Sequence, residues 1–269
     1  MADVPAEFFG APPQQAMQRL GAALWPLVSA NPRFAYEGRF VAIDAPDVAD
    51  LDAMGSLVAL QGGTGAFFVD AAKEAALLAG LKARGLTTDR WDHLMADASA
   101  VPVCRALVEN YRVPEGFVLR ELGADTPQAE MAAFAAMAMD CGVNAPAGRV
   151  FRGGRPSVLF VIADAAGDII ACSGAVARHE AGSPFADASW WGMLATRPDV
   201  RGRGFSRYLG ALALLAMADR HGKRRYYTGV RPDNAVSQKL CRSLGLGDHG
   251  LAVIAALDPA RFGDVRLTR

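Results

Sequence analysis

The first part of the chain mixes two patterns of apolar positions. Apolar residues between 14 and 28 recur every three to four residues, which predicts a helix. Aromatic and β-branched residues are concentrated in 34–43 and 66–69, which are expected to be extended. Residues 71–84 and 88–97 are expected to be helices, the first ended by Gly85. We therefore expect a mixed α/β region without a visible catalytic motif.

A Pro- and Gly-containing segment, Val113–Gly116, separates this region from a more regular pattern. Beyond it, the apolar runs predict strands at 117–122, 157–163, 169–178, 188–196, 225–230 and 252–257, and helices at 125–139, 205–220 and 234–244. The pair at 157–178 is the clearest hairpin. The order predicts an α/β (α+β) fold, with a mixed, partly antiparallel sheet flanked by helices. We expect two domains, residues 1–115 and 116–269.

Composition narrows the class of protein. The chain has 269 residues, of which 52% are apolar, so either domain can bury a core. Lys and Arg total 28 and Asp and Glu total 28, and this zero net charge argues against general nucleic-acid binding. The four cysteines form no CxxC pair or zinc-site spacing, so we expect neither disulfides nor a metal. With no signal-peptide pattern and no membrane-spanning run, the sequence predicts a cytoplasmic protein away from the membrane.

The most informative segment is a glycine-rich turn between a predicted strand and a predicted helix. The strand ends at Leu194, Ala195 and Thr196, and the turn reads Arg201, Gly202, Arg203, Gly204, Phe205 and Ser206. The first N–H groups of a helix lack partners within it and carry partial positive charge, so they bind anions. The glycines allow close approach of a ligand, and nine Lys and Arg residues fall between 197 and 231. The pattern predicts a phosphate site.

The turn resembles the acyl-CoA motif of the GNAT superfamily of N-acetyltransferases, Arg/Gln-x-x-Gly-x-Gly/Ala. The stretch Arg201–Gly204 matches the first four positions, with Arg201 and Gly204 on the fixed ones, and Ser206 replaces the last Gly or Ala. Downstream, the segment 234–246 resembles a second GNAT pattern through Asn234 and Gly245, with Ser237 in place of Ala. The resemblance extends over about residues 117–257.

This resemblance implies the reaction and its ligand. Acetyl-CoA would be the co-substrate, and an amine of a small molecule or peptide would attack its thioester directly. The backbone of Leu194, Ala195 and Thr196 would pair with the pantetheine arm, which Asn234 would also contact. The N–H groups of Arg201–Ser206 would hold the pyrophosphate. A homodimer is compatible with the sequence.

The acid and the base depart from the family pattern. The strand 189–196 has no carboxylate, so Glu180 is the candidate base, with His179, Asp187 or a water chain as alternatives. Cys241 occupies the place of the usual tyrosine acid. A thiol could protonate the leaving thiolate, a nearby tyrosine could replace it, or Cys241 could simply pack in the core.

Three further points stay open at this level. Trp190 and Trp191 alternate on one strand, so one should face the core and the other the acceptor cleft. Residues 1–115 could be a degenerate copy of the GNAT fold or a domain for acceptor binding or dimerisation. The missing acid and base also allow a non-catalytic acyl-CoA sensor, and an interaction module without cofactor is a third option.

Overall fold

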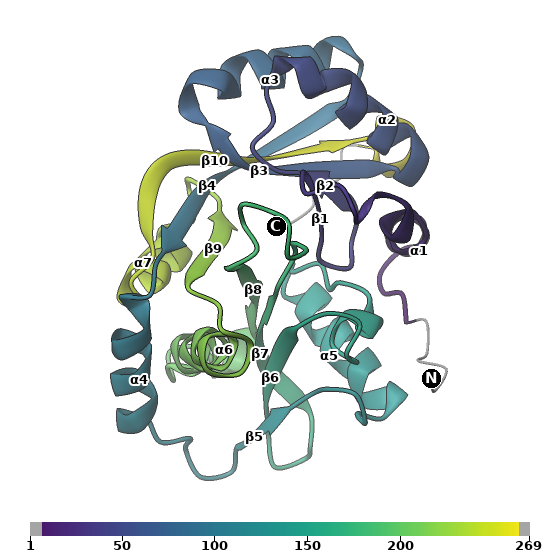
Figure 1. The fold of residues 1–269 in the computed structure, drawn as a ribbon. Coiled ribbons are helices and arrows are strands. Elements are labelled where there is room, and N and C mark those ends of the chain that lie inside the picture. Colours follow the sequence, from purple (N-terminus) through teal and green to yellow (C-terminus); the bar gives the residue numbers. More distant parts are fainter. Residues whose placement is uncertain (1–6, 264–269) are drawn as a thin grey trace.

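The computed structural model describes residues 7–263, and its centre is one sheet of eight strands (Figure 1). All neighbouring strands are antiparallel except β8 and β9, which run parallel. The order across the sheet is β3 (Gly63–Asp70), β10 (Gly247–Leu257), β4 (Thr87–Ala96), β9 (Arg225–Val230), β8 (Ala188–Thr196), β7 (Ile169–Val176), β6 (Ser157–Ala163) and β5 (Val118–Glu121). The predicted mixed, partly antiparallel sheet is therefore confirmed, and most of its strand pairs are antiparallel.

Helices cover both faces of this sheet. In the lower half of Figure 1, α5 (Gln128–Asp140) covers one face, and α6 (Phe205–His221) with α4 (Ala100–Asn110) covers the other. The upper half carries α1 (Pro12–Val28), α2 (Leu51–Gln61), α3 (Ala71–Ala83) and a small sheet of β1 (Phe34–Tyr36) with β2 (Val41–Ile43). The remaining helices, α7 (Ala235–Ser243) and α8 (Pro259–Phe262), flank β10 in the sequence.

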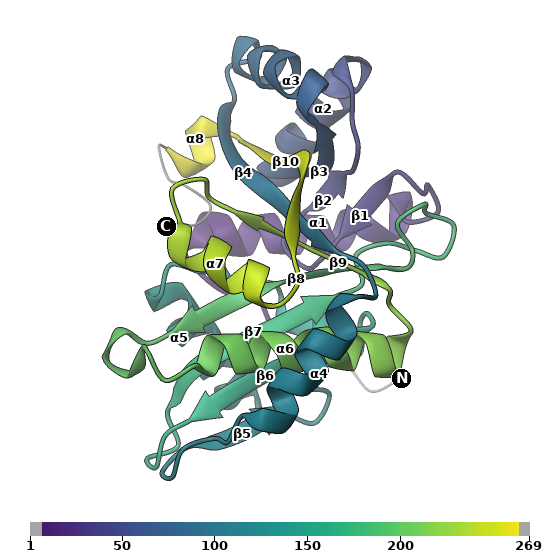
Figure 2. The ribbon, with the colours of Figure 1, turned by 90° about the vertical axis from the view of Figure 1, so that its left-hand side faces the viewer.

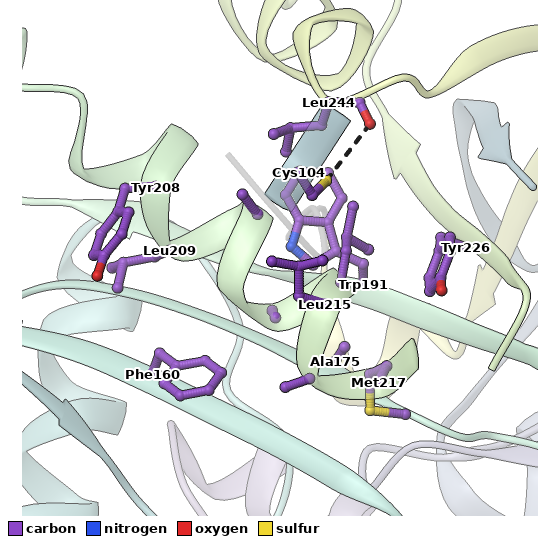
Figure 3. Close-up of a cluster of buried hydrophobic side chains, with 14 of the residues drawn as sticks. Cys104, Phe160, Ala175, Trp191, Tyr208, Leu209, Leu215, Met217, Tyr226 and Leu244 are labelled. Carbon is purple, nitrogen blue, oxygen red and sulfur yellow. Dashed lines mark hydrogen bonds between the residues drawn. The ribbon is translucent and has the colours of Figure 1, made fainter. Parts of the chain in front are cut away.

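Side chains that alternate along β8 and β9 fill two different cores. Trp191 and Tyr226 belong to the cluster beneath α6, where Figure 3 shows them with Cys104 and Leu244. Trp190 and Tyr227 belong to the cluster on the α5 face. The two tryptophans, which are neighbours on β8, therefore point to opposite faces of the sheet, and so do the two tyrosines on β9, as a period of two requires.

The prediction of a helix at residues 88–97 is wrong, because this segment is strand β4. Its backbone pairs with β10 on one side and with β9 on the other, and Trp91, His93 and Leu94 are buried there. The helix comes one turn later, as α4. Local propensity does not include the backbone hydrogen bonds that β4 makes with two strands more than 120 residues away in the sequence. The helix α2 was not predicted either.

The sheet runs across the expected domain boundary near residue 115. Strand β10, close to the end of the described chain, lies between β3 and β4 of the N-terminal region. Strand β4 in turn pairs with β9, and α4 packs against α6. The division into 1–115 and 116–269 remains a proposal, but the two parts share backbone hydrogen bonds (Figure 2).

Candidate functional site

The site forms where two parallel strands separate. Strands β8 and β9 pair only through Ala188–Trp190 and Arg225–Tyr227, and no pairing continues beyond these residues. Between the separated ends lies a cleft of about 650 Å³. One wall is β8 from Gly192 to Thr196, and the other is β9 from Thr228 to Val230. Because the edge of β8 that faces β9 lacks a partner strand beyond Trp190, its backbone can pair there with an extended ligand.

A bulge in β8 marks the point of separation. Cys172 of β7 lies opposite Ala195 and Gly174 lies opposite Gly192, so β8 has one extra residue between them. Met193 adopts a φ of 54°, a conformation uncommon for a residue with a side chain. The Cys172 thiol donates to the Met193 carbonyl oxygen at 3.0 Å. Such bulges bend a strand and redirect its backbone, here toward the cleft.

The glycine-rich turn closes one end of the cleft. Gly202 and Gly204 have φ values of 83° and 82°, and Gly204 is the N-cap of α6. Within residues 7–263, the backbone N–H groups of residues 202–206 make no hydrogen bond to the protein. This places several free donors at the positive end of a 17-residue helix. The turn is built to receive an anion.

Side chains hold this turn in place from two directions. The Thr196 and Ser206 hydroxyls lie 2.7 Å apart, and Arg201 Nε donates to the Thr196 carbonyl oxygen at 3.1 Å. From the other side, the Tyr111 hydroxyl donates to the Arg203 carbonyl oxygen at 2.8 Å. A Cβ on Gly204 would come within 3.1 Å of the Tyr111 ring. A residue of the N-terminal region therefore supports the predicted phosphate site.

The arginines near the turn divide into two groups. Arg201, Arg203 and Arg207 line the cleft and are exposed. Arg197 instead makes two bonds to Asp199, at 2.8 and 2.9 Å. The first three therefore supply the positive charge that a phosphate would meet.

The residues predicted on α7 also line the cleft. Asn234 Oδ1 accepts a hydrogen bond from the Ser237 amide at 3.0 Å, so this side chain caps the helix. Cys241 is 2% exposed. Burial raises the pKa of its thiol to about 12, so the thiol is protonated at neutral pH.

The candidate bases lie elsewhere. Glu180 is in a separate hollow at the other end of β8, half-exposed and bonded to Arg155 at 3.1 Å. His179 is buried with its Nε2 2.6 Å from Asp44 Oδ2, and Asp187 pairs with Arg225. None of the three lines the cleft. The structure brings the predicted cofactor-binding residues and Cys241 together, but not Glu180.

A second, smaller pocket of about 120 Å³ opens beside the cleft. The two share the lining residues Arg39, Trp91, Trp190 and Gly229. Its other walls come from the N-terminal region, which includes Glu37, from β10, and from Asn144. Sequence reasoning missed these residues because they stand in no motif and meet only through the tertiary fold. Trp190 lines both hollows, whereas Trp191 lines the cleft alone.

Within residues 7–263, no three His, Cys, Asp or Glu side chains lie together as a metal site. In the same part of the chain, no helix has the length and hydrophobicity needed to cross a bilayer.

Two parallel strands that separate beside a glycine-rich helix start offer a backbone edge for an extended ligand and free N–H groups for a phosphate. Residues 128–246 match the family model described as acetyltransferase (GNAT) family. The chain therefore contains a GNAT domain in its C-terminal part, as the two motifs predicted.

Solved structures resemble the chain over almost its whole length. A GCN5-related N-acetyltransferase from Kribbella flavida is 15% identical, with a TM-score of 0.58, covering 93% of this chain and 98% of its own. A tandem GNAT protein from the clavulanic acid biosynthesis pathway is 15% identical, with a TM-score of 0.53, covering 93% and 89%. At such identity the likeness concerns the fold. No curated protein sequence matches the chain.

Proposed function

We propose that the protein is an acetyl-CoA-dependent N-acyltransferase that transfers an acetyl group to the amine of a small molecule or peptide. The observation that carries the proposal is the cleft between β8 and β9, which runs from the unpaired β8 backbone to the free N–H groups of residues 202–206. Pantetheine amides would pair with Leu194, Ala195 and Thr196. The pyrophosphate would bind at Arg201–Ser206, with Asn234 near the pantetheine.

The chemistry forms a C–N bond and breaks the thioester C–S bond. The attacking amine must be neutral, and the departing thiolate takes up a proton. Cys241 is the donor that the sequence suggests, but a thiol with a pKa of about 12 gives up its proton reluctantly, so we expect it to contribute less than about tenfold to turnover. Glu180 remains a proposed base. Because it lines a separate hollow and not the cleft, water or Glu37 is the better placed group to take the proton from the amine. Among residues 7–263, Glu37 is the one carboxylate lining the cleft or the small pocket beside it.

A second candidate is a non-catalytic acyl-CoA sensor. This candidate is favoured because, among the described residues, no Asp or Glu side chain lines the cleft. Both candidates bind acetyl-CoA, and turnover distinguishes them. We also propose a cytoplasmic location, because the four cysteines are free thiols, as in a reducing compartment.

The test is calorimetry of acetyl-CoA binding to matched charge reversals. Arg203→Glu places a negative charge on the turn, and we expect acetyl-CoA affinity to fall at least about tenfold, since charge-assisted bonds to phosphate contribute about 1.5–3 kcal/mol. Arg224→Glu makes the same change at an exposed arginine outside the cleft and should bind as the wild type does. Equal affinities in all three proteins would refute the assignment of the turn.

A further inference from the structure

The small pocket beside the cleft contains polar groups that the protein does not satisfy. Asn144 is 5% exposed and lines the pocket. Within the described chain, neither its Oδ1 nor its Nδ2 has a hydrogen-bond partner. A buried amide without partners costs free energy unless a ligand or water completes it. The pocket is therefore made for a polar group.

Arg39 stands next to this amide. The Arg39 Nε donates to the main-chain carbonyl oxygen of Asn144 at 3.0 Å, and its Nη2 contacts the same main-chain oxygen. These contacts fix the guanidinium in place. The group also lies 4.7 Å from the ring centre of Trp190. Its Nη1 makes no hydrogen bond within residues 7–263, and the carboxylate of Glu37 is 3.9 Å away. One guanidinium nitrogen thus remains available to a ligand.

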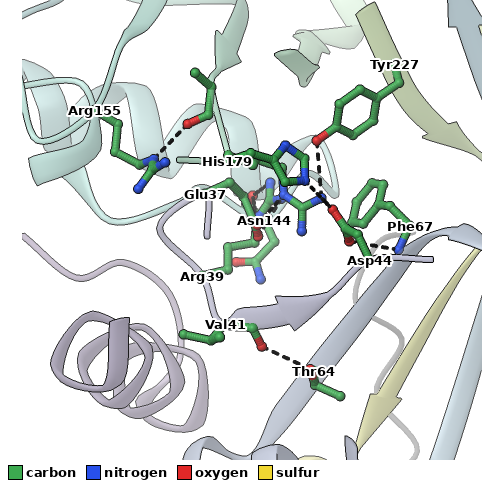
Figure 4. A network of polar contacts seen from close by, with 12 residues as sticks. Glu37, Arg39, Val41, Asp44, Thr64, Phe67, Asn144, Arg155, His179 and Tyr227 are labelled. Carbon is green, nitrogen blue, oxygen red and sulfur yellow. Dashed lines mark hydrogen bonds and ion pairs between the residues drawn. The ribbon is translucent and has the colours of Figure 1, made fainter. Parts of the chain in front are cut away.

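Glu37 is directed toward another partner. Glu37 belongs to the polar network shown in Figure 4. Its Oε2 accepts from Arg178 Nε at 2.9 Å, and Arg178 is completely buried. Arg178 also bonds to Asp44 at 3.1 Å. The close ion pairs of Glu37 and Asp44 are therefore made with Arg178. Arg39 lies at the pocket wall with a longer ion pair to Glu37, at 3.9 Å, and burial lowers the pKa of its guanidinium.

The walls around these groups are apolar and aromatic. Trp91 and Trp190 line the pocket together with Phe40, Phe67, Val253 and Ile254. A volume of about 120 Å³ suits a compact group and excludes a folded polypeptide. The opening into the cleft passes Trp190 and Gly229, and Trp190 is the last residue of β8 that pairs with β9 before the two strands separate.

We propose that this pocket is the acceptor site and that it selects a small amine bearing a carboxylate, that is, an amino acid with an apolar side chain. Arg39 Nη1 and Asn144 Nδ2 donate to the carboxylate, and the apolar side chain lies against Trp91 and Trp190. The amino group faces the cleft. This inference rests on the proposed acetyl transfer and deepens it by naming the class of acceptor.

The experiment compares amines that differ only in the carboxylate. Wild-type protein with acetyl-CoA is assayed for CoA thiol release with the common apolar α-amino acids, such as leucine and phenylalanine. Each is paired with its α-carboxamide and its decarboxylated amine. The carboxamide is the stricter control, because its amino group is less basic and is neutral in a larger fraction of molecules. We expect kcat/KM for the best amino acid to exceed that for its carboxamide by about 10- to 100-fold.

The variant Arg39→Gln should reduce this ratio toward one while leaving acetyl-CoA affinity, measured by calorimetry, within about threefold. Arg39→Lys should retain part of the preference. Arg84→Gln, at a distant exposed arginine paired with Asp52, should keep the wild-type ratio.

Each remaining outcome is decisive. Equal or faster turnover of the carboxamides or decarboxylated amines overturns the acceptor class, as does binding of acetyl-CoA without acetylation of any amino acid. Failure to bind acetyl-CoA at all would instead contradict the proposed function itself.

Discussion

Cys241 shows how environment decides what a residue type can do. In the sequence it occupies the place of a tyrosine that acts as an acid in the resembling family, and in the structure it lines the cleft. Its neighbours bury it, however, and burial raises the pKa of the thiol to about 12. An ordinary thiol has a pKa of about 8.5, so donation to a CoA thiolate is uphill by roughly three pKa units.

We therefore expect Cys241→Ala to lower kcat less than tenfold and to lower the free energy of unfolding by about 1 kcal/mol. Steady-state kinetics and denaturant unfolding measure the two effects. Cys104→Ala is the matched control, since Cys104 is also a buried thiol but does not line the cleft. A drop in kcat of a hundredfold or more, seen in Cys241→Ala alone, would establish Cys241 as the proton donor.

At the scale of elements, the glycine-rich turn at residues 201–206 is contacted by the end of a helix that the sequence did not predict. Helix α4 ends just before Tyr111, whose ring stacks on Tyr208 of α6 at a centroid distance of 4.5 Å. Its hydroxyl bonds to the Arg203 carbonyl oxygen inside the turn. The turn is thus held both by its own helix and by the end of α4.

Removing that bond should loosen the turn without changing its charge. Tyr111→Phe keeps the stacked ring and deletes one hydrogen bond, which contributes about 0.5–1.5 kcal/mol. We expect acetyl-CoA affinity to fall about two- to tenfold in calorimetry. Tyr208→Phe removes the hydroxyl of the stacked partner, and we expect it to have little effect. Wild-type affinity in Tyr111→Phe would show that the turn is rigid without α4.

At the scale of the whole molecule, the sheet joins the two halves of the chain. Strand β4 pairs with both β9 and β10, and β10 lies between β3 and β4. The acceptor pocket also lies across the two halves, with Arg39 and Trp91 on one side and Trp190 on the other.

A fragment beginning at Val113 would lose β3 and β4 and leave β10 without a partner strand and one edge of β9 unpaired. Exposed strand edges promote aggregation, so we expect this fragment to be insoluble or to lack a cooperative unfolding transition. The full chain, expressed in parallel, is the control. A soluble fragment that unfolds cooperatively and binds acetyl-CoA would show that residues 116–269 form an independent domain.

Local patterns determined the GNAT part of the molecule. The strand 188–196, the turn 201–206 and the helix that follows it are read from residues next to one another, because helix starts and glycine conformations depend on the nearest neighbours. The hairpin of β6 and β7 could be predicted for the same reason, and so could the grouping of residues 194–196 and 201–206 along one cleft.

Tertiary structure alone decided the rest. Residues 87–96 are a strand because β9 and β10 supply its ladders, which outweigh a local tendency toward helix. Glu180 lies outside the cleft because the end of β7 carries it to the opposite end of β8. The acceptor pocket joins Arg39, Trp91, Asn144 and Trp190, which are far apart in the sequence. Packing between distant segments creates such a site, and no local pattern records it.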